Sequence, residues 1–240
     1  MSVPNVYDWN RIRAALTLLQ EAFPGLLENV VLIGGGACWF YREALRQYED
    51  RDFRVPAWTK AEEAIWLSKD VDFMGLDREE ASQLLQTPFD EETHTFHFRG
   101  LEIDFLEEGL RLTPQNAVLS RRVAQLPELT FYVAEASLLY AEKSALVQAK
   151  TRPQDRIHER LLALFLKCEF CREIENPETL NPARWVGRAR VVKTATFDFF
   201  STDAPFVERL RNGIARLTEP RHKAIHHWEK HHLRQADETM

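Results

Sequence analysis

The sequence Lys-Asp-Val-Asp-Phe at residues 69–73 decides the fold, together with Leu-Glu-Ile-Asp-Phe-Leu at residues 101–106. Each stretch alternates apolar and charged residues, which is typical of a strand with one face in the core. Asp70 and Asp72 therefore share one face of the first strand, and Glu102 and Asp104 share one face of the second. If the two strands are neighbours, three or four carboxylates converge. We favour Asp104 over Glu102 as the third, because Asp104 lies deeper in the apolar run.

Converging carboxylates indicate a metal site. Carboxylates this close repel one another unless a cation lies between them, and hard cations such as Mg²⁺ prefer carboxylate oxygens. Two such cations, about 3.5–4 Å apart, can activate an attacking hydroxyl and stabilise a phosphate leaving group. The alternative is a sheet face or edge strand that is simply open to water.

A glycine-rich turn follows another expected strand. The apolar run Val30–Ile33 is followed by Gly34-Gly35-Gly36, and a helix is expected from about Ala37 to Tyr48. Backbone N–H groups and the N-terminus of this helix could hold a phosphate, although a tight turn without a ligand is the structural alternative. A dinucleotide-binding fingerprint does not fit, because its last glycine would fall on Trp39 and a helix precedes the strand.

The remaining pattern predicts an α/β region followed by a helical one. Asp8 is the expected N-cap of a helix that ends at Pro24-Gly25, and Asp77 with Glu80 forms a capping box for a helix through Leu85. Strands are expected over residues 93–98 and 101–106, turning at residues 99–100, and a short helix over residues 60–67. Helices are also expected around residues 138–146, 157–168 and 203–217, and from residue 219 onward. The predicted fold class is a mixed α/β (α+β) sheet with flanking helices in residues 1–128, followed by a helical domain in residues 129–240.

Net charge and apolar patterning indicate which partners and which cellular location to expect. The formal net charge is −6, which argues against coating nucleic acid by bulk electrostatics. Basic residues gather late in the chain, either as a surface for a polyanionic substrate or as solvated helix faces. The first residues lack a signal-peptide pattern, and no apolar run approaches the roughly 20 residues of a membrane span. The expected location is the cytoplasm, with no membrane partner.

Three further clusters are expected to be structural. The three cysteines form no disulfide framework, and the pair Cys168 and Cys171 has helical spacing that favours packing over a metal or redox role. The aromatic run 39–41 is expected in the core rather than as a base-stacking platform. The histidines of the last segment include i,i+4 pairs that could bind a metal, but a polar terminal helix needs no ligand; they are His222, His226, His227, His231 and His232.

Taken together, the glycine turn, the Asp-x-Asp strand and the third acidic strand resemble the polymerase-β-like nucleotidyltransferase superfamily. Residues 134–146 and 152–155, with a lysine on one helix and Arg-x-x-Asp opening the next, look like the helical segment of abortive-infection toxin-type members. The resemblance implies that Gly34 and Gly35 position a nucleoside triphosphate (NTP) and that a lysine lies near its phosphates. It implies Mg²⁺ as the cofactor. The residues that match are Asp70, Asp72 and Asp104 for Mg²⁺ and Lys143 for the phosphates.

Two departures set this chain apart from that family. The segment between the glycine turn and residue 69 is longer than in compact members, and His158 stands where toxin-type members often carry a second aspartate. Asp155 matches an acidic position to which the resemblance assigns no definite role. On its own, Lys143 would be taken for a solvent-facing helix residue.

The expected function is transfer of a nucleoside monophosphate from an NTP to a hydroxyl acceptor, with Asp104 helping to deprotonate that hydroxyl. The acceptor stays open between an RNA end such as that of tRNA, a protein side chain and a small molecule. Two alternatives remain. One is a catalytically silent binding module, or a toxin–antitoxin component with an antitoxin partner. The other is a metal-dependent phosphohydrolase using the same acids.

Overall fold

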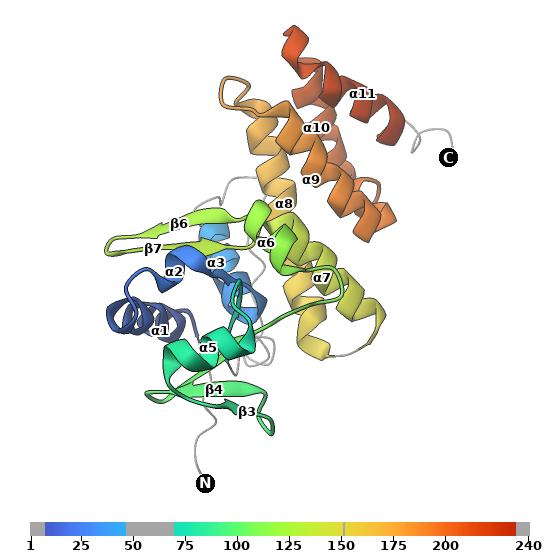
Figure 1. Ribbon diagram of the computed structural model, residues 1–240. Helices are drawn as coiled ribbons and strands as arrows, with labels where there is room; N and C mark the ends of the chain where they lie inside the picture. Colours follow the sequence, from blue (N-terminus) through green and yellow to red (C-terminus); the bar gives the residue numbers. More distant parts are fainter. Residues whose placement is uncertain (1–7, 47–69, 151, 234–240) are drawn as a thin grey trace.

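A seven-stranded mixed sheet forms the centre of the first half of the chain. The computed structural model describes residues 8–46, 70–150 and 152–233, and the helix expected over residues 60–67 lies outside them. The strand order is β3-β4-β5-β2-β1-β7-β6 (Figure 1). The expected α/β class, with flanking helices and a helical C-terminal region, is confirmed.

The middle of the sheet brings the two acidic stretches together. β2 (Val71–Met74) and β5 (Leu101–Phe105) pair in parallel, with Asp72 opposite Asp104. β1 (Val31–Leu32) runs antiparallel to β2 on its other side. The apolar residues of β2 and β5 are buried, and the rings of Phe73 and Phe105 stack with centroids 5.7 Å apart. This packing fixes which face the carboxylates occupy.

Two hairpins complete the sheet. β4 (Thr95–Phe98) pairs antiparallel with β5 through a turn at residues 99–100, as predicted, and β3 (Phe89–Asp90) forms the edge. β6 (Arg122–Leu126) and β7 (Leu129–Val133) form the second hairpin, in which β7 runs parallel to β1. The sheet thus continues past residue 128 to Val133, and the helical region begins at Ala136 rather than at the expected residue 129.

Helices of the first half pack around this sheet. They are α1 (Trp9–Ala22), α2 (Leu26–Asn29), α3 (Gly34–Arg46), α5 (Arg78–Leu85) and α6 (Pro114–Leu119). The predicted caps are confirmed: Asp8 accepts the Arg11 N–H at 2.9 Å, and Asp77 and Glu80 form a capping box. α3 begins at Gly34 instead of Ala37, so the glycines form the first turn of the helix rather than a loop before it.

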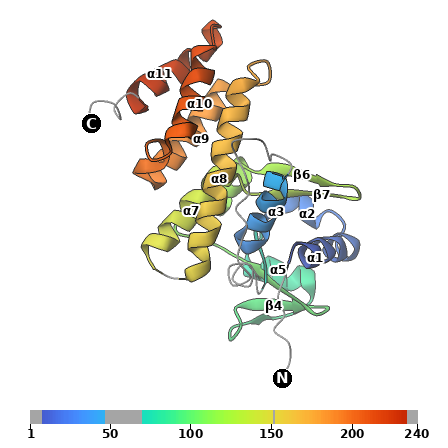
Figure 2. The same cartoon turned by 180° about the vertical axis from the view of Figure 1, so that it is seen from behind.

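The second half is helical throughout. α7 (Ala136–Gln148) and the long α8 (Pro153–Glu175) pack side by side, and α8 continues upward beside α9 (Pro182–Ala195) and α10 (Ala204–Ala215) (Figures 1 and 2). Two short 3₁₀ turns, η1 (Phe197–Phe200) and η2 (Pro220–His222), precede α10 and α11 (Lys223–His232). The elements that were not predicted are α2, β3, α6, β6, β7, α9 and η1.

α8 ties the helical region to the sheet through buried aromatic packing. The ring of Tyr41 on α3 lies 4.7 Å from that of Phe165 on α8, and the Tyr41 hydroxyl donates a hydrogen bond to the Ala134 carbonyl at 2.7 Å. The three cysteines are buried and form no disulfide with one another, consistent with their expected role in packing. None of the helices in the described ranges is long and apolar enough to cross a membrane.

Candidate functional site

The three predicted carboxylates face one cavity. Asp72 and Asp104 lie opposite each other on β2 and β5, and Asp70 directly precedes β2. All three line a cavity of about 620 Å³, whereas Glu102 is not among its lining residues. The alternation along both strands predicted this shared face, and the parallel pairing of the strands brings the acids together.

Burial and mutual repulsion act on these acids. The pKa of Asp72 is raised from 3.8 to about 8, first by burial and then by the negative charges of Asp70 and Asp104. The pKa of Asp104 is raised to about 6 by burial and by Asp70, against the opposing effect of Arg78. Such shifts show that the site disfavours the carboxylates in their charged form unless a cation joins them.

The donor set fits a hard cation. The Oδ1 atom of Asp104 is buried, and no hydrogen-bond donor reaches it within the described parts of the chain. A buried carboxylate oxygen of this kind is the ligand that Mg²⁺ prefers. Among the residues that the structure describes, no three His, Cys, Asp or Glu side chains are arranged so that they could together hold a metal ion. The site therefore offers ligands on one face without a preformed cage.

Gly34 lies directly against Asp72. Gly34 has a φ of 59°, and a Cβ atom built on it would come within 1.7 Å of the Asp72 Oδ2 atom. The Ile33 N–H donates to the Asp72 carbonyl at 2.9 Å, which fixes the strand beside the start of α3. Only glycine permits both this backbone conformation and this close approach. Gly34 lines the cavity, whereas Gly35 is buried in the first turn of α3 and does not.

Lys143 closes the opposite side of the cavity from α7. Its side chain is buried, and its Nζ atom donates to the Asp155 Oδ1 atom at 2.8 Å. Arg152 contacts the other carboxylate oxygen of Asp155, at 3.4 Å from Nε, and also lines the cavity. Lys143 is thus not the solvent-facing residue that its helix position alone suggested. Asp155, at the start of α8, holds both cations toward the cavity.

His158 lies one turn along α8 from Asp155. It is buried, and its pKa is lowered well below the usual value by burial and by the charges of Lys143 and Arg152. His158 is therefore neutral at physiological pH and adds no charge near the lysine. The position at which toxin-type proteins carry an acid thus holds an uncharged ring here.

The sequence analysis missed several lining residues. Arg152 was predicted only as part of the Arg-x-x-Asp motif. The loop at residues 106–112 was not predicted to line the site, because its sequence has no periodicity. Its side chains make the cavity partly apolar, since Leu106, Leu110 and Leu112 line it together with Leu139 and Leu146 of α7. Only the tertiary structure places this loop opposite α7.

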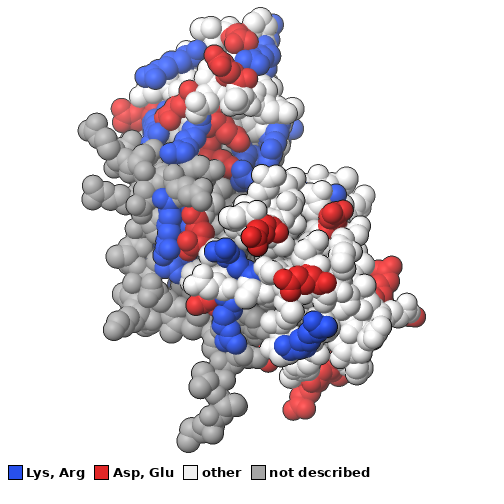
Figure 3. All heavy atoms as spheres, turned by 90° about the vertical axis from the view of Figure 1, so that its left-hand side faces the viewer, with Lys and Arg blue, Asp and Glu red and all other residues white. Residues whose placement is uncertain are grey.

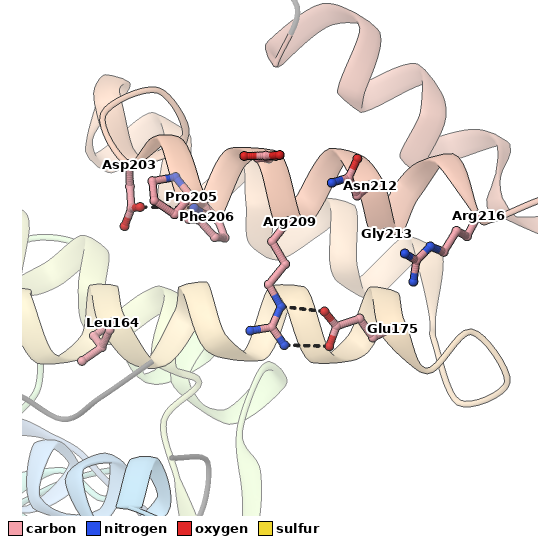
Figure 4. Close-up of a pocket in the computed structure, with 10 residues that line it drawn as sticks. Leu164, Glu175, Asp203, Pro205, Phe206, Arg209, Asn212, Gly213 and Arg216 are labelled. Carbon is pink, nitrogen blue, oxygen red and sulfur yellow. Dashed lines mark hydrogen bonds and ion pairs between the residues drawn. The ribbon is translucent and has the colours of Figure 1, made fainter. Parts of the chain in front are cut away.

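Two other cavities contain none of the predicted site residues. One, of about 400 Å³, lies between α8 and α10, where Arg209 and Glu175 form a two-pronged ion pair at 2.6 and 2.9 Å (Figure 4). The other, of about 750 Å³, lies between the α6–β6 corner and α9. Its arginines are engaged: Arg184 contacts Glu135 at 2.7 Å, and both Arg122 and Arg188 contact Glu169 at 2.6 Å.

The histidines of the last helices form no metal centre in the described chain. His226 bonds the Leu217 carbonyl at 2.6 Å, and the rings of His227 and His231 lie 4.4 Å apart. His222 is buried. His222 thus takes part in the packing of the terminal helices, and the interpretation that this segment needs no ligand stays a prediction.

Comparison with known proteins finds a weakly similar solved structure and no matching family or curated protein. No family model matches the chain, and no curated protein matches it. A solved structure, described as an antigenic nucleotidyltransferase-like protein from Paracoccidioides brasiliensis, is similar at 11% sequence identity and a TM-score of 0.47. The match covers 86% of this chain and 94% of that chain. At this level of similarity the site has to be interpreted from its own residues.

Proposed function

We propose that this protein is a Mg²⁺-dependent nucleotidyltransferase. The observation that carries the proposal is the pairing of Asp72 with Asp104 across β2 and β5, with Gly34 directly against Asp72 and Lys143 across the same cavity. Acids together with the buried Lys143 and the exposed Arg152 around one cavity suit a polyphosphate that is bridged by divalent metal.

The residues divide into two roles. Asp70, Asp72 and Asp104 would hold Mg²⁺, which when bound neutralises the charge that develops on the phosphates. Lys143 and Arg152 provide positive charge for the triphosphate from the opposite wall, and the start of α3 at Gly34 offers backbone N–H groups. Gly35 supports this turn from the core. The residues given these roles by the family resemblance line one cavity, except for Gly35.

The proposed reaction needs one proton acceptor. The acceptor hydroxyl attacks the α-phosphorus of the NTP, a new P–O bond forms, and the bond to pyrophosphate breaks. The hydroxyl proton passes to a carboxylate. Asp104 suits this role because its pKa of about 6 lies near working pH and one of its oxygens is buried without a donor in the described structure. The acceptor itself remains an RNA end, a protein side chain or a small molecule.

The test is transfer of label from each of the four NTPs, labelled in the α-phosphate, into whole-cell extract with Mg²⁺. We expect a labelled product with the wild-type protein and none with the Asp70→Asn, Asp72→Asn double variant. Asp90→Asn, on the β3 edge and outside the cavity, is the matched control and should transfer normally. The chemical nature of the labelled product would identify the acceptor class.

The by-products and partners separate the competing hypotheses. Release of pyrophosphate supports transfer, whereas release of inorganic phosphate without a labelled acceptor supports the phosphohydrolase. Mg²⁺-dependent NTP binding without any product would contradict the proposal and favour a silent module. Co-purification of an inhibitory protein partner would place an active enzyme in a toxin–antitoxin pair.

A further inference from the structure

One wall of the cavity is a loop without regular structure. Residues 106–112 connect β5 to α6, and five of them line the cavity directly after Asp104, namely Leu106, Glu108, Gly109, Leu110 and Leu112. Loops of this kind are mobile unless their backbone polar groups find partners. The shape of the cavity beside the acids therefore depends on what holds the loop.

A single carboxylate holds it. Glu142 on α7 accepts three successive backbone N–H groups: that of Leu110 at 3.1 Å, that of Arg111 at 2.5 Å and that of Leu112 at 3.0 Å. The first bond goes to Oε1 and the other two go to Oε2, so both oxygens are used. Hydrogen bonds to an ionised carboxylate are stronger than those between neutral groups. This arrangement fixes the loop against α7 at three consecutive residues.

The loop backbone also approaches the carboxylate closely. A Cβ atom built on Gly109 would lie 2.9 Å from the Glu142 Oε1 atom, which is nearer than a real Cβ contact allows. The Gly109 N–H donates to the Leu112 carbonyl at 2.8 Å and closes the turn around the carboxylate. A side chain at residue 109 would therefore have to displace the carboxylate from the three N–H groups that it accepts.

Glu142 has no other charged partner in the part of the chain that the structure describes. Its side chain is buried, so an ionised carboxylate would be costly there without the three N–H donors. The next residue, Lys143, forms its ion pair with Asp155 instead. Adjacent residues of α7 thus have separate tasks in one cavity. Lys143 presents a cation, and Glu142 fixes the loop beside it.

We propose that Glu142 is a positioning residue for the nucleotide, and this inference rests on the proposed function. By holding loop 106–112, Glu142 keeps Leu110 and Leu112 in the lining of the cavity that Leu139 and Leu146 also line, where an apolar surface suits the base and sugar rather than the phosphates. A free loop would have to be ordered each time a nucleotide binds, and that entropy loss weakens affinity. The acids on β2 and β5 are untouched, so the chemical step is preserved.

Two variants disturb the contact from opposite sides. Glu142→Gln keeps the shape of the side chain but turns an amide group toward N–H donors, and Gly109→Ala pushes the loop off the carboxylate. Gly187→Ala on α9 is the matched control, because a Cβ there meets nothing within 4 Å and Gly187 does not line this cavity. The readouts are hydrogen exchange of the amides of residues 110–112, the affinity for a non-hydrolysable Mg²⁺–NTP analogue, and KM and kcat for label transfer.

We expect both variants to raise KM and the Kd of the analogue by roughly tenfold, the effect of losing about one strong hydrogen bond. We expect kcat to stay within about twofold of wild type, because the interaction lost contributes to binding and not to the chemical step. Exchange at residues 110–112 should become faster in both variants. The control should match wild type in every readout.

The outcomes separate this inference from the proposed function. If wild type binds the analogue but transfers nothing, and both variants bind it tenfold more weakly, the proposed reaction fails while Glu142 keeps its positioning role. Unchanged exchange and unchanged Kd in folded Glu142→Gln overturn the inference. A lower kcat with unchanged KM also overturns it, as does a wild-type protein that binds no nucleotide.

Discussion

At the residue scale, the fold places Asp72 and Asp104 where their ionisation is unfavourable. Asp72 and Asp104 lie side by side because the strands that carry them have apolar residues on the other face, so the core decides where the acids point. Burial and neighbouring charge then raise the pKa values of both side chains. A protein keeps such an arrangement where a cation or a substrate uses it.

The first prediction concerns Asp72→Asn. The pKa of Asp72 is raised from 3.8 to about 8 on folding, so the ionisation of Asp72 has no effect on stability below about pH 4 and destabilises the fold increasingly as the pH rises toward 8. Without metal at pH 8, the variant should exceed wild type in free energy of unfolding by about 2 kcal/mol, less than the full shift implies because Asp72 is only half-buried. Urea unfolding in EDTA at pH 4, 6 and 8 measures this.

Mg²⁺ provides the control for that series. A cation that binds the folded acids should stabilise wild type and leave the variant unchanged, which would reverse their order at pH 8. At pH 4 the two proteins should be equally stable in EDTA. A variant that is less stable than wild type at pH 8 in EDTA would show that the raised pKa is not a property of this site.

The second prediction concerns Gly34→Ala. The new methyl group would occupy the position of the Asp72 Oδ2 atom, and alanine is strained at a φ of 59°. We expect a loss of about 1–2 kcal/mol in stability and a fall in transfer of at least roughly 100-fold, since a displaced carboxylate no longer lies beside Asp104. Thermal unfolding and label transfer check the two effects. Transfer at the wild-type rate would show that the close approach of Gly34 to Asp72 has no role.

At the element scale, local signals predicted individual elements well and their partners poorly. The capping box of Asp77 and Glu80 fixed the start of α5, and the alternation of residues 101–106 fixed β5, because both signals lie within a few residues. β7 has the same alternation, with Leu129, Phe131 and Val133 buried, but it was not among the predicted strands. β7 forms a hairpin with β6, whereas its parallel pairing with β1, which lies far away along the sequence, has no local signal.

The third prediction tests the contact between α7 and α8. Lys143 and Asp155 form a buried ion pair, and removing one partner leaves the other charge poorly compensated. Lys143→Met should lower the free energy of unfolding by about 3 kcal/mol. The double variant Lys143→Met, Asp155→Leu should recover much of this loss, because no charge is then buried alone. Urea unfolding of the single and double variants gives the coupling energy.

Neither variant should transfer label, because both lack the cation that we assign to the phosphates. This separates stability from function at the same position. If Lys143→Met unfolds like wild type and still transfers label, the ion pair is neither a structural brace nor part of the site.

At the scale of the whole molecule, several arginines of the helical region form ion pairs and hydrogen bonds within the fold. The late basic residues contact carboxylates or carbonyls of the fold: Arg209 pairs with Glu175, Arg211 donates to the Leu233 carbonyl and Arg221 donates to that of Pro177. On the face shown in Figure 3, Lys and Arg side chains alternate with Asp and Glu instead of forming one continuous patch. This favours the interpretation of solvated, internally paired helix faces over a continuous polyanion-binding surface on that side.

The fourth prediction concerns Glu169, which joins the sheet to the helical region. Its carboxylate on α8 contacts Arg122 of β6 and Arg188 of α9, each at 2.6 Å. Glu169→Gln would leave two buried or half-buried guanidinium groups without this charge. We expect a loss of about 3 kcal/mol, or a fall in Tm of roughly 6–12 °C for a chain of this size.

Glu175→Gln is the matched control for this measurement. Glu175 lies on the same helix α8 and pairs with Arg209 of α10, but this pair is partly exposed, so its loss should change stability by at most about 1 kcal/mol. Differential scanning calorimetry of both variants compares them directly. Equal shifts in Tm for the two would contradict a bracing role for Glu169.

The sequence by itself determined the elements that carry the acids and the face on which those acids lie. The period of two along residues 70–73 and 101–105 is a local property, and burial of one face follows from it. Only the tertiary structure decided that Asp155 holds Lys143 and Arg152, and that Glu142 holds loop 106–112. These contacts join segments with no common periodicity. A charged side chain finds such partners only after packing has removed it from water and fixed which backbone groups lie within reach.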